Sequence, residues 1–252
     1  MVTCVVTSQA RSEAARSSYV RPMGSPLVLG VDGCSKGWLG IAIGAAVTAH
    51  FGTTIGDLVQ LVEDQIGRPD VVAIDIPIGL PDATIRAADR LARTMIGPRR
   101  MSVFFTPTRQ ALQEPDYAAA QIVNRELTGG GFSQQAWALR PKILEVDAWA
   151  RSTTSSVLEV HPELSFATMA GAPLLTRKSS YAGFQQRQNL LTANGIVLPP
   201  DLGIAGDLGG VDDVLDAAAA TWSARRYARG EAGSVPDPPE HLNDGIDCAI
   251  WY

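Results

Sequence analysis

Three short apolar runs near the start of the chain, separated by only a few residues each, constrain the fold most strongly. They occupy residues 27–31, 38–43 and 47–51. Connections this short leave no room for a crossover helix, so the runs predict strands joined as antiparallel hairpins. A fourth apolar run, 71–78, follows an amphipathic helical pattern at 55–66, and a strand reached through a helix is expected to be parallel.

Residues 82–153 interrupt this pattern with helices expected at 84–96, 116–127 and 134–150, and we interpret them as a helical insertion. Beyond it, the pattern predicts a strand at 155–160, a helix near 184–193 and a long final helix from residue 211. Residues 236–239 indicate an extended linker, and 246–251 a possible edge strand. The expected fold is therefore α/β: a mixed sheet of three antiparallel strands and then parallel strands, with helices on both faces.

Length and composition bound the kind of protein. The 252 residues allow one large domain or one domain with a long insertion, which we expect to span residues 27–252 after a disordered N-terminal tail at 1–26. A net charge of -5 argues against a protein that coats nucleic acid by bulk charge. No apolar run approaches the roughly 18 residues of a membrane span, so no membrane partner is expected.

The three cysteines, Cys4, Cys34 and Cys248, are widely spaced and form no C-x-x-C pair that would bind zinc or run redox exchange. Free thiols fit a reducing compartment best. We therefore expect a cytoplasmic protein.

Two acids accompany the buried strands. Asp32 closes the first apolar run, and Asp75 interrupts the fourth. An ionised carboxylate buried there costs several kcal/mol without a partner or a metal. If the two strands are neighbours, the carboxylates converge at one end of the sheet and attract a divalent cation. The alternative is structural: Asp32 as a turn residue before Gly33, and Asp75 as an acid that accepts from backbone amides in the turn at Pro77.

A second acidic cluster begins the final helix. Asp213 and Asp216 are three residues apart, and Asp212 and Asp216 four apart, so Asp216 lies beside both on one helix face. Acids at a helix N-terminus also cap free amides, and this alternative suits Asp212 and Asp213. Four alanines follow Asp216 and allow the helix to approach the sheet closely, which would carry Asp216 toward Asp32 and Asp75.

Other candidate groups are less informative. Glu159 alternates with apolar residues of its strand and is a possible additional acid, as is Asp212. His50, His161 and His241 are isolated histidines, for which structural hydrogen bonding is the favoured interpretation. The spacing supports no Ser-His-Asp or Cys-His arrangement and no phosphate-binding Walker pattern.

Positive charge is concentrated in the insertion. Residues 86–109 hold six arginines and a single acid, Asp89. Arg matches phosphate oxygens bidentately, so we expect this segment to hold an anionic backbone, with Phe104 and Phe105 able to stack on bases. The alternatives are a solvated helix face and a core aromatic pair. The candidate phosphate-binding residues are Arg86, Arg90, Arg93, Arg99, Arg100, Lys178 and Arg187.

Four motifs resemble the family catalogued as domain of unknown function 429, which is grouped with the RuvC-type, ribonuclease H-like nucleases. They are residues 31–33 with 37–38, residues 74–80, residues 159–163 and residues 213–217, and the likeness covers about 27–252. The resemblance implies a ribonuclease H-like fold, with Asp32, Asp75, Asp213 and Asp216 as catalytic metal ligands. One departure is that RuvC-type resolvases generally carry Glu on the fourth strand, where this chain has the shorter Asp75.

Four acids from separate elements, with few candidate bases, are what metal-dependent phosphodiester hydrolysis requires. We therefore predict a nuclease, a hydrolase that uses a two-metal-ion mechanism with Mg²⁺ or Mn²⁺ and a nucleic acid or nucleotide substrate. One alternative is a nucleotide-dependent phosphotransferase of the actin-like kinase type, although such enzymes need two halves of this kind and the strand pattern occurs once. The other is a non-catalytic module that binds nucleic acid or protein.

Overall fold

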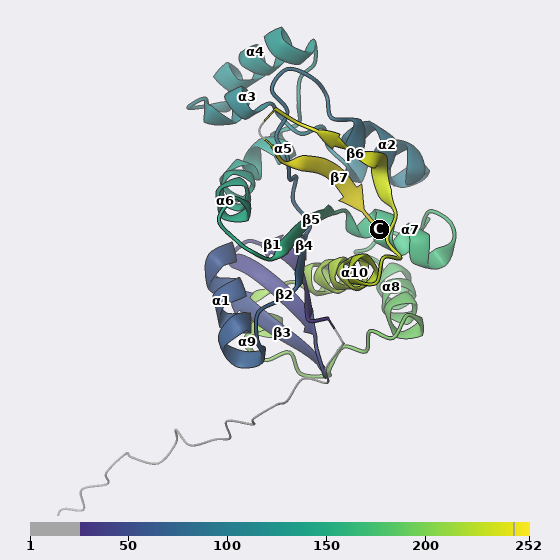
Figure 1. The fold of residues 1–252 in the computed structure, drawn as a ribbon. Coiled ribbons are helices and arrows are strands. Elements are labelled where there is room, and N and C mark those ends of the chain that lie inside the picture. The colour runs from purple at the N-terminus through teal and green to yellow at the C-terminus, as the bar shows by residue number, and fades with distance from the viewer. Residues whose placement is uncertain (1–25, 244) are drawn as a thin grey trace, which may run out of the picture.

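The computed structural model describes residues 26–243 and 245–252, so the tail expected at 1–26 lies, except for Pro26, outside the described residues. A seven-stranded mixed sheet forms the centre, in the order β3-β2-β1-β4-β5-β7-β6 (Figure 1). The strands are β1 (Val28–Cys34), β2 (Gly37–Ile43), β3 (Val47–Gly52), β4 (Val71–Ile74), β5 (Ser156–Val160), β6 (Ser234–His241) and β7 (Asp247–Trp251).

The strand directions confirm the expected topology. β1, β2 and β3 pair antiparallel, whereas β4 is parallel to β1 and β5 is parallel to β4. In this register Val31 of β1 lies opposite Ile74 of β4, which in turn lies opposite Glu159 of β5. The carboxyl ends of these three strands therefore meet at one edge of the sheet. This mixed order is consistent with a ribonuclease H-like fold.

Helices cover both faces of the sheet (Figure 1). Alternate residues of β2 face opposite ways: Trp38 packs with Leu58 of α1 on one side, and Ile41 packs with Leu215 of α10 on the other. A Cβ on Gly30 of β1 would lie only 2.0 Å from a backbone nitrogen of α10, so glycine is required where the helix crosses the strand. Outside the insertion the helices are α1 (Ile55–Ile66), α7 (Pro162–Ala170), α8 (Tyr181–Ala193), α9 (Ile204–Leu208) and α10 (Val211–Ala228).

The segment between β4 and β5 is helical, as expected. Its first helix begins at Ala87, three residues later than the sequence predicted, and the helix expected at 134–150 is two helices. The break falls before Pro141, which has no backbone N–H to donate to the preceding turn and instead takes its place in the first turn of a new helix. The elements are α2 (Ala87–Met95), the 3₁₀ helix η1 (Gly97–Ser102), α3 (Arg109–Gln113), α4 (Tyr117–Thr128), α5 (Gln134–Ala138) and α6 (Arg140–Ala150).

Several expectations were wrong at the C-terminal side of the sheet. Residues 236–239 are not a linker but part of the edge strand β6. They tolerate prolines because they lie in an irregular stretch between Val235 and Glu240 that has no paired residues in β7. The strand expected at the edge, β7, instead lies between β5 and β6. The buried run Cys248-Ala249-Ile250 explains this, because an interior strand has no solvent-facing residues. Elsewhere in the chain, η1, α3, α7 and α9 were not predicted from the sequence.

Cys34 and Cys248 are buried free thiols. In the part of the chain that the structure describes, no helix combines the length and apolarity needed to cross a membrane.

Candidate functional site

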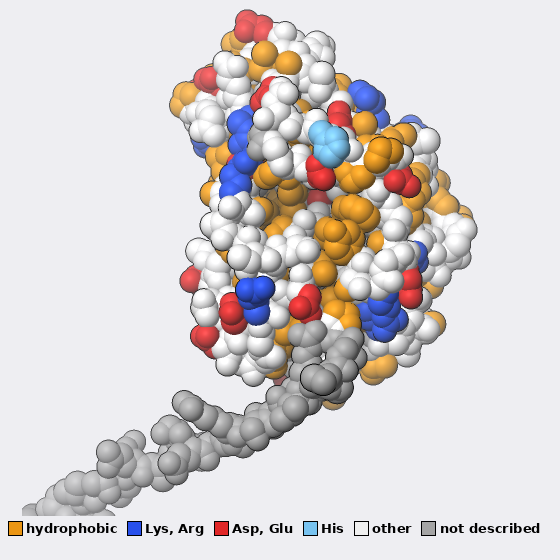
Figure 2. All heavy atoms as spheres, in the orientation of Figure 1, with side chains coloured by type: hydrophobic (Ala, Val, Ile, Leu, Met, Phe, Trp, Pro, Cys, Tyr) orange, Lys and Arg blue, Asp and Glu red, His pale blue; other side chains and the backbone are white. Residues whose placement is uncertain are grey.

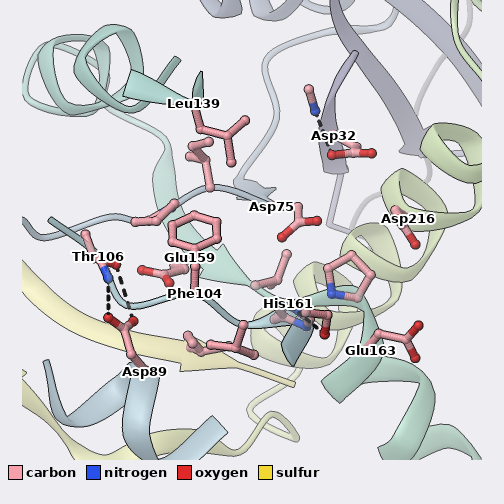
Figure 3. Close-up of a pocket in the computed structure, with 18 of the residues that line it drawn as sticks. Asp32, Asp75, Asp89, Phe104, Thr106, Leu139, Glu159, His161, Glu163 and Asp216 are labelled. Atoms are coloured by element: carbon pink, nitrogen blue, oxygen red, sulfur yellow. Dashed lines mark hydrogen bonds between the residues drawn. The ribbon is translucent and has the colours of Figure 1, made fainter. Parts of the chain in front are cut away.

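A pocket of about 300 Å³ opens at the edge of the sheet where β1, β4 and β5 end. Its walls come from this edge, from the start of α7, from α10 and from the insertion. Figure 3 shows the carboxylates of Asp32, Asp75 and Asp216 around a common space, although they belong to segments far apart in the sequence. The structure thus brings together the acids on which the sequence analysis depended.

Asp32 lies near the end of β1 and is only 8% exposed. Its Oδ1 accepts a hydrogen bond from the amide of Gly33 at 2.7 Å, so it has the turn role that was the structural alternative. Burial raises the pKa of Asp32 well above its usual range, and repulsion from Asp75 and Asp216 raises it further. The carboxylate therefore stabilises the turn and is held close to other acids.

Asp75 follows the last residue of β4, and its backbone amide donates to Val31 of β1 at 2.9 Å. Among the described residues, its carboxylate has no hydrogen bond and no ion pair. The structural alternative fails here, because the amide of Ile78 in the following turn donates to Glu159 instead. Burial raises the pKa of Asp75 to about 7; Lys178 opposes the shift and Glu159 adds to it. Asp75 is thus a half-buried acid without a structural partner among the described residues.

Asp216 reaches the pocket because α10 packs closely against the sheet. The small side chains at 217–220 are fully buried, and Thr221 donates its hydroxyl to the carbonyl of Ile41 at 2.7 Å. Asp216 itself is 5% exposed. Burial raises the pKa of Asp216 to about 6, with Lys178 opposing the shift and Asp75 adding to it. The expectation that the alanine run would carry this acid to the strand ends is confirmed.

Lys178 supplies positive charge at the pocket. Its Nζ lies 2.7 Å from Asp216 and 3.9 Å from Asp212. Partial burial acts to lower the pKa of Lys178, but the attraction of Asp216 outweighs it and the net direction is upward. The side chain stays 43% exposed, so the ammonium group is charged and accessible from solvent.

The two acids at the start of α10, Asp212 and Asp213, have different positions and contacts. Asp213 lines the pocket, and its Oδ2 also accepts from the amide of Gly210 at 2.8 Å, so it caps the helix. Asp212 lies outside the pocket lining, with Lys178 as its ion-pair partner. The capping alternative is therefore confirmed for Asp213.

Glu159 and Arg86 form a buried structural network. Arg86 is 1% exposed, and its guanidinium donates to Glu159 at 2.7 and 2.8 Å and pairs with Asp89. Glu159 also accepts from Ile78, as described above. The expectation that Arg86 binds phosphate is therefore wrong, because its donors are committed to protein acceptors. Glu159, a possible additional acid from the sequence, has the Arg86 guanidinium as its partner.

The other arginines are also mostly occupied by the protein. Arg187 is fully buried and pairs with Glu163 at 2.6 Å, so it is not available to phosphate either. Arg93 donates to the carbonyl of Val103 and lies over the ring of Phe105, while Arg99 donates to two carbonyls at 174–175. Arg90 and Arg100 remain exposed. On the face in Figure 2, Lys and Arg lie in separate groups and form no continuous basic band.

The pocket residues that were not predicted as site residues include His161, Glu163 and Lys142. Nδ1 of His161 and Oε2 of Glu163 are buried and have no hydrogen-bond partner among the described residues. Burial lowers the pKa of His161, so the imidazole is neutral at pH 7. The sequence could have indicated His161 and Glu163 by their position, because they directly follow a strand that runs parallel to β4. Lys142, from the distant α6, gave no such signal.

The donor set suits a hard divalent cation in its chemistry. Within the described residues, no three His, Cys, Asp or Glu side chains lie close enough, as they stand, to hold a metal ion. Mg²⁺, however, keeps several waters and commonly takes only one or two carboxylates from the protein. Asp75 has no partner among the described residues. Its charge raises the pKa of both Asp32 and Asp216, so a cation placed among the three would relieve repulsion that Lys178 relieves only in part. We conclude that the carboxylates of this pocket suit a divalent cation.

Comparison with known proteins identifies one family. A family model described as "Protein of unknown function (DUF429)" matches residues 30–241, which include every acid discussed above. No curated protein and no solved structure matches the chain.

Proposed function

Because the chain belongs to this DUF429 family, whose description assigns no activity, we propose a function from the site itself: divalent-cation-dependent hydrolysis of phosphodiester bonds, a nuclease activity. The observation that carries the proposal is the meeting of Asp32, Asp75 and Asp216 in one pocket. Buried carboxylates are costly, and Asp75 has no structural reason for its position. Strongly shifted acids gathered in a cleft are typical of functional sites.

The ligands we assign to the cation are Asp32, Asp75 and Asp216, with Asp213 at the rim as a further ligand. The metal is Mg²⁺ or Mn²⁺, because every donor in this set is a carboxylate oxygen. When bound, such a cation supplies an activated water and charge stabilisation for the leaving oxygen.

The chain's cations complete the site. The ammonium of Lys178 is placed to bind a non-bridging phosphate oxygen, because it is exposed and already lies at the carboxylates. The Nζ of Lys142 donates to the carbonyl of Gly37 at 2.7 Å and lies over the ring of Trp38, so this cation is fixed beside the turn between β1 and β2. The seven acids and three cations of the lining give an excess of negative charge. A phosphate is therefore expected to bind only together with the divalent cation.

The proposal is tested by comparing wild type with Asp75→Asn in two measurements. The first is the melting temperature during Mg²⁺ and Mn²⁺ titration, and the second is cleavage of a panel of single-stranded and duplex DNA and RNA. Wild type should be stabilised by the metal and should cleave at least one substrate, whereas Asp75→Asn should lose both responses.

Asp116→Asn is the matched control. Asp116 caps α4 through the amide of Ala119 and lies outside the pocket lining, and Asn caps a helix as well as Asp. This variant should respond to metal as wild type does. An identical metal response in wild type and Asp75→Asn would reject the assigned site and favour a non-catalytic module.

A further inference from the structure

The pocket is not an open groove at the sheet edge, because the insertion forms one of its walls. This wall adds apolar and polar groups opposite the acids of β1, β4 and α10. Its residues are Ser102, Val103, Phe104, Thr106, Gln135, Leu139 and Lys142. A volume of about 300 Å³ lies at the lower end of the range for small-molecule pockets, roughly 300–1,000 Å³.

Phe104 distinguishes the insertion wall. Among the described residues that line the pocket it is the only phenyl ring, and Figure 3 shows it near Asp75 and Glu159. The ring packs in part against the buried cluster of Ala111, Ala120, Phe132 and Ala136, and the rest of it is exposed. The adjacent Phe105 is also partly exposed, but it lies outside the pocket lining and carries Arg93 4.7 Å above its ring. The part of the ring that lines the pocket lies beside a charged site and offers a stacking surface for a flat ring system.

The arginines support a small ligand as well. A protein that grips a long polyanion presents many free cations along its path, but here Arg86 and Arg187 are buried in ion pairs and Arg93 and Arg99 are bound to backbone carbonyls. Asp32 and Asp216 are almost fully buried, so a phosphate must enter the pocket to meet them. A paired nucleotide is held within its duplex, and enzymes that act there must first extrude it.

We infer that the pocket receives a single unpaired nucleotide unit, with its base against the ring of Phe104 and its phosphate among Asp32, Asp75 and Asp216. The inference rests on the proposed function for the placement of the phosphate. The same chemistry is offered by a free nucleotide and by the end of a single strand, and both are expected to bind. A base-paired segment is excluded.

The test measures binding to the full-length chain by titration calorimetry with Mn²⁺ present. The probes are adenosine monophosphate, ribose 5-phosphate, a single-stranded phosphorothioate tetranucleotide, and a duplex whose two ends are closed by non-nucleotide linkers. Adenosine monophosphate and the single strand should bind. Ribose 5-phosphate, which lacks the base, and the closed duplex should each bind about ten-fold more weakly or worse.

Two variants locate the base. Phe104→Leu keeps apolar volume but removes the aromatic face. It should weaken the binding of adenosine monophosphate about five- to ten-fold and leave the affinity for ribose 5-phosphate unchanged. Phe105→Leu, the control, should change neither affinity. The melting temperature of each variant shows that it is folded.

Three results would overturn the inference: equal binding of the closed duplex and the single strand, no effect of Phe104→Leu, or Mn²⁺ binding without nucleotide binding. Failure of the proposed function looks different. In that case Mn²⁺ shows no binding heat of its own and Asp75→Asn changes nothing, whereas adenosine, which carries no phosphate, still binds and is still weakened by Phe104→Leu.

Discussion

At the scale of single residues, Asp75 links stability to function. Its carboxyl group is half-buried and has no hydrogen bond within the described residues, and desolvation raises its pKa to about 7, from an ordinary value of 3.8. The folded protein therefore holds this proton more tightly than the unfolded chain does. Between about pH 4 and pH 7 the unfolded state releases the proton first, so the contribution of Asp75 to the free energy of unfolding falls as the pH rises.

This fall in stability with rising pH leads to a prediction for Asp75→Asn measured without divalent cations. Asn is neutral at every pH, so the variant avoids the cost of the buried charge. Its melting temperature should exceed that of wild type by about 2–4 °C at pH 8 for each kcal/mol relieved, and the difference should shrink toward zero by pH 4. Differential scanning calorimetry across this range measures the difference. A gap that does not depend on pH would contradict the argument.

At the scale of secondary-structure elements, the close packing of α10 on β1 places Asp216. Gly30 allows the contact, since any Cβ there would collide with the backbone of the helix at Ala217 and Thr221. The contact is fixed by the hydroxyl of Thr221, which donates to a carbonyl of β2. The position of the catalytic candidate therefore depends on a residue that carries no side chain.

Gly30→Ala should accordingly push α10 away from the sheet. We expect a loss of about 1–3 kcal/mol or more in the free energy of unfolding, the usual cost of overpacking a core, together with weaker Mn²⁺ binding. Urea unfolding and metal titration measure the two effects. Gly56→Ala in α1 is the control, because its Cβ would meet only ordinary contacts at 3.8 Å and alanine favours a helix. Equal stability of both variants would refute the packing role.

At the scale of the whole molecule, the sequence predicted the sheet better than the site. Hydrophobic runs and short connections are local signals, and they gave the antiparallel strands, the parallel crossover and the helical insertion. The meeting of Asp32, Asp75 and Asp216 followed from that topology. The burial of Arg86 could not be predicted from the topology, because its partner Glu159 is 73 residues away and no local pattern distinguishes a buried arginine from an exposed one.

The charge distribution of the molecule predicts how binding depends on salt. The pocket offers one accessible ammonium, Lys178, and a second that is already bound, Lys142. Binding of a single strand should therefore release only one or two counterions, and affinity should fall by no more than about seven-fold between 50 and 200 mM salt. Fluorescence anisotropy at constant free Mn²⁺ measures this. A fall of about a thousand-fold or more would instead indicate an extended basic surface.

The prolines of β6 affect how readily another polypeptide can pair with this edge of the sheet. This strand forms one margin of the sheet, and Pro236, Pro238 and Pro239 lack the N–H groups that an incoming strand would need. Another polypeptide aligning itself along this stretch would find too few donors to extend the ladder. The margin thus carries its own protection against the edge-to-edge association by which sheet proteins aggregate.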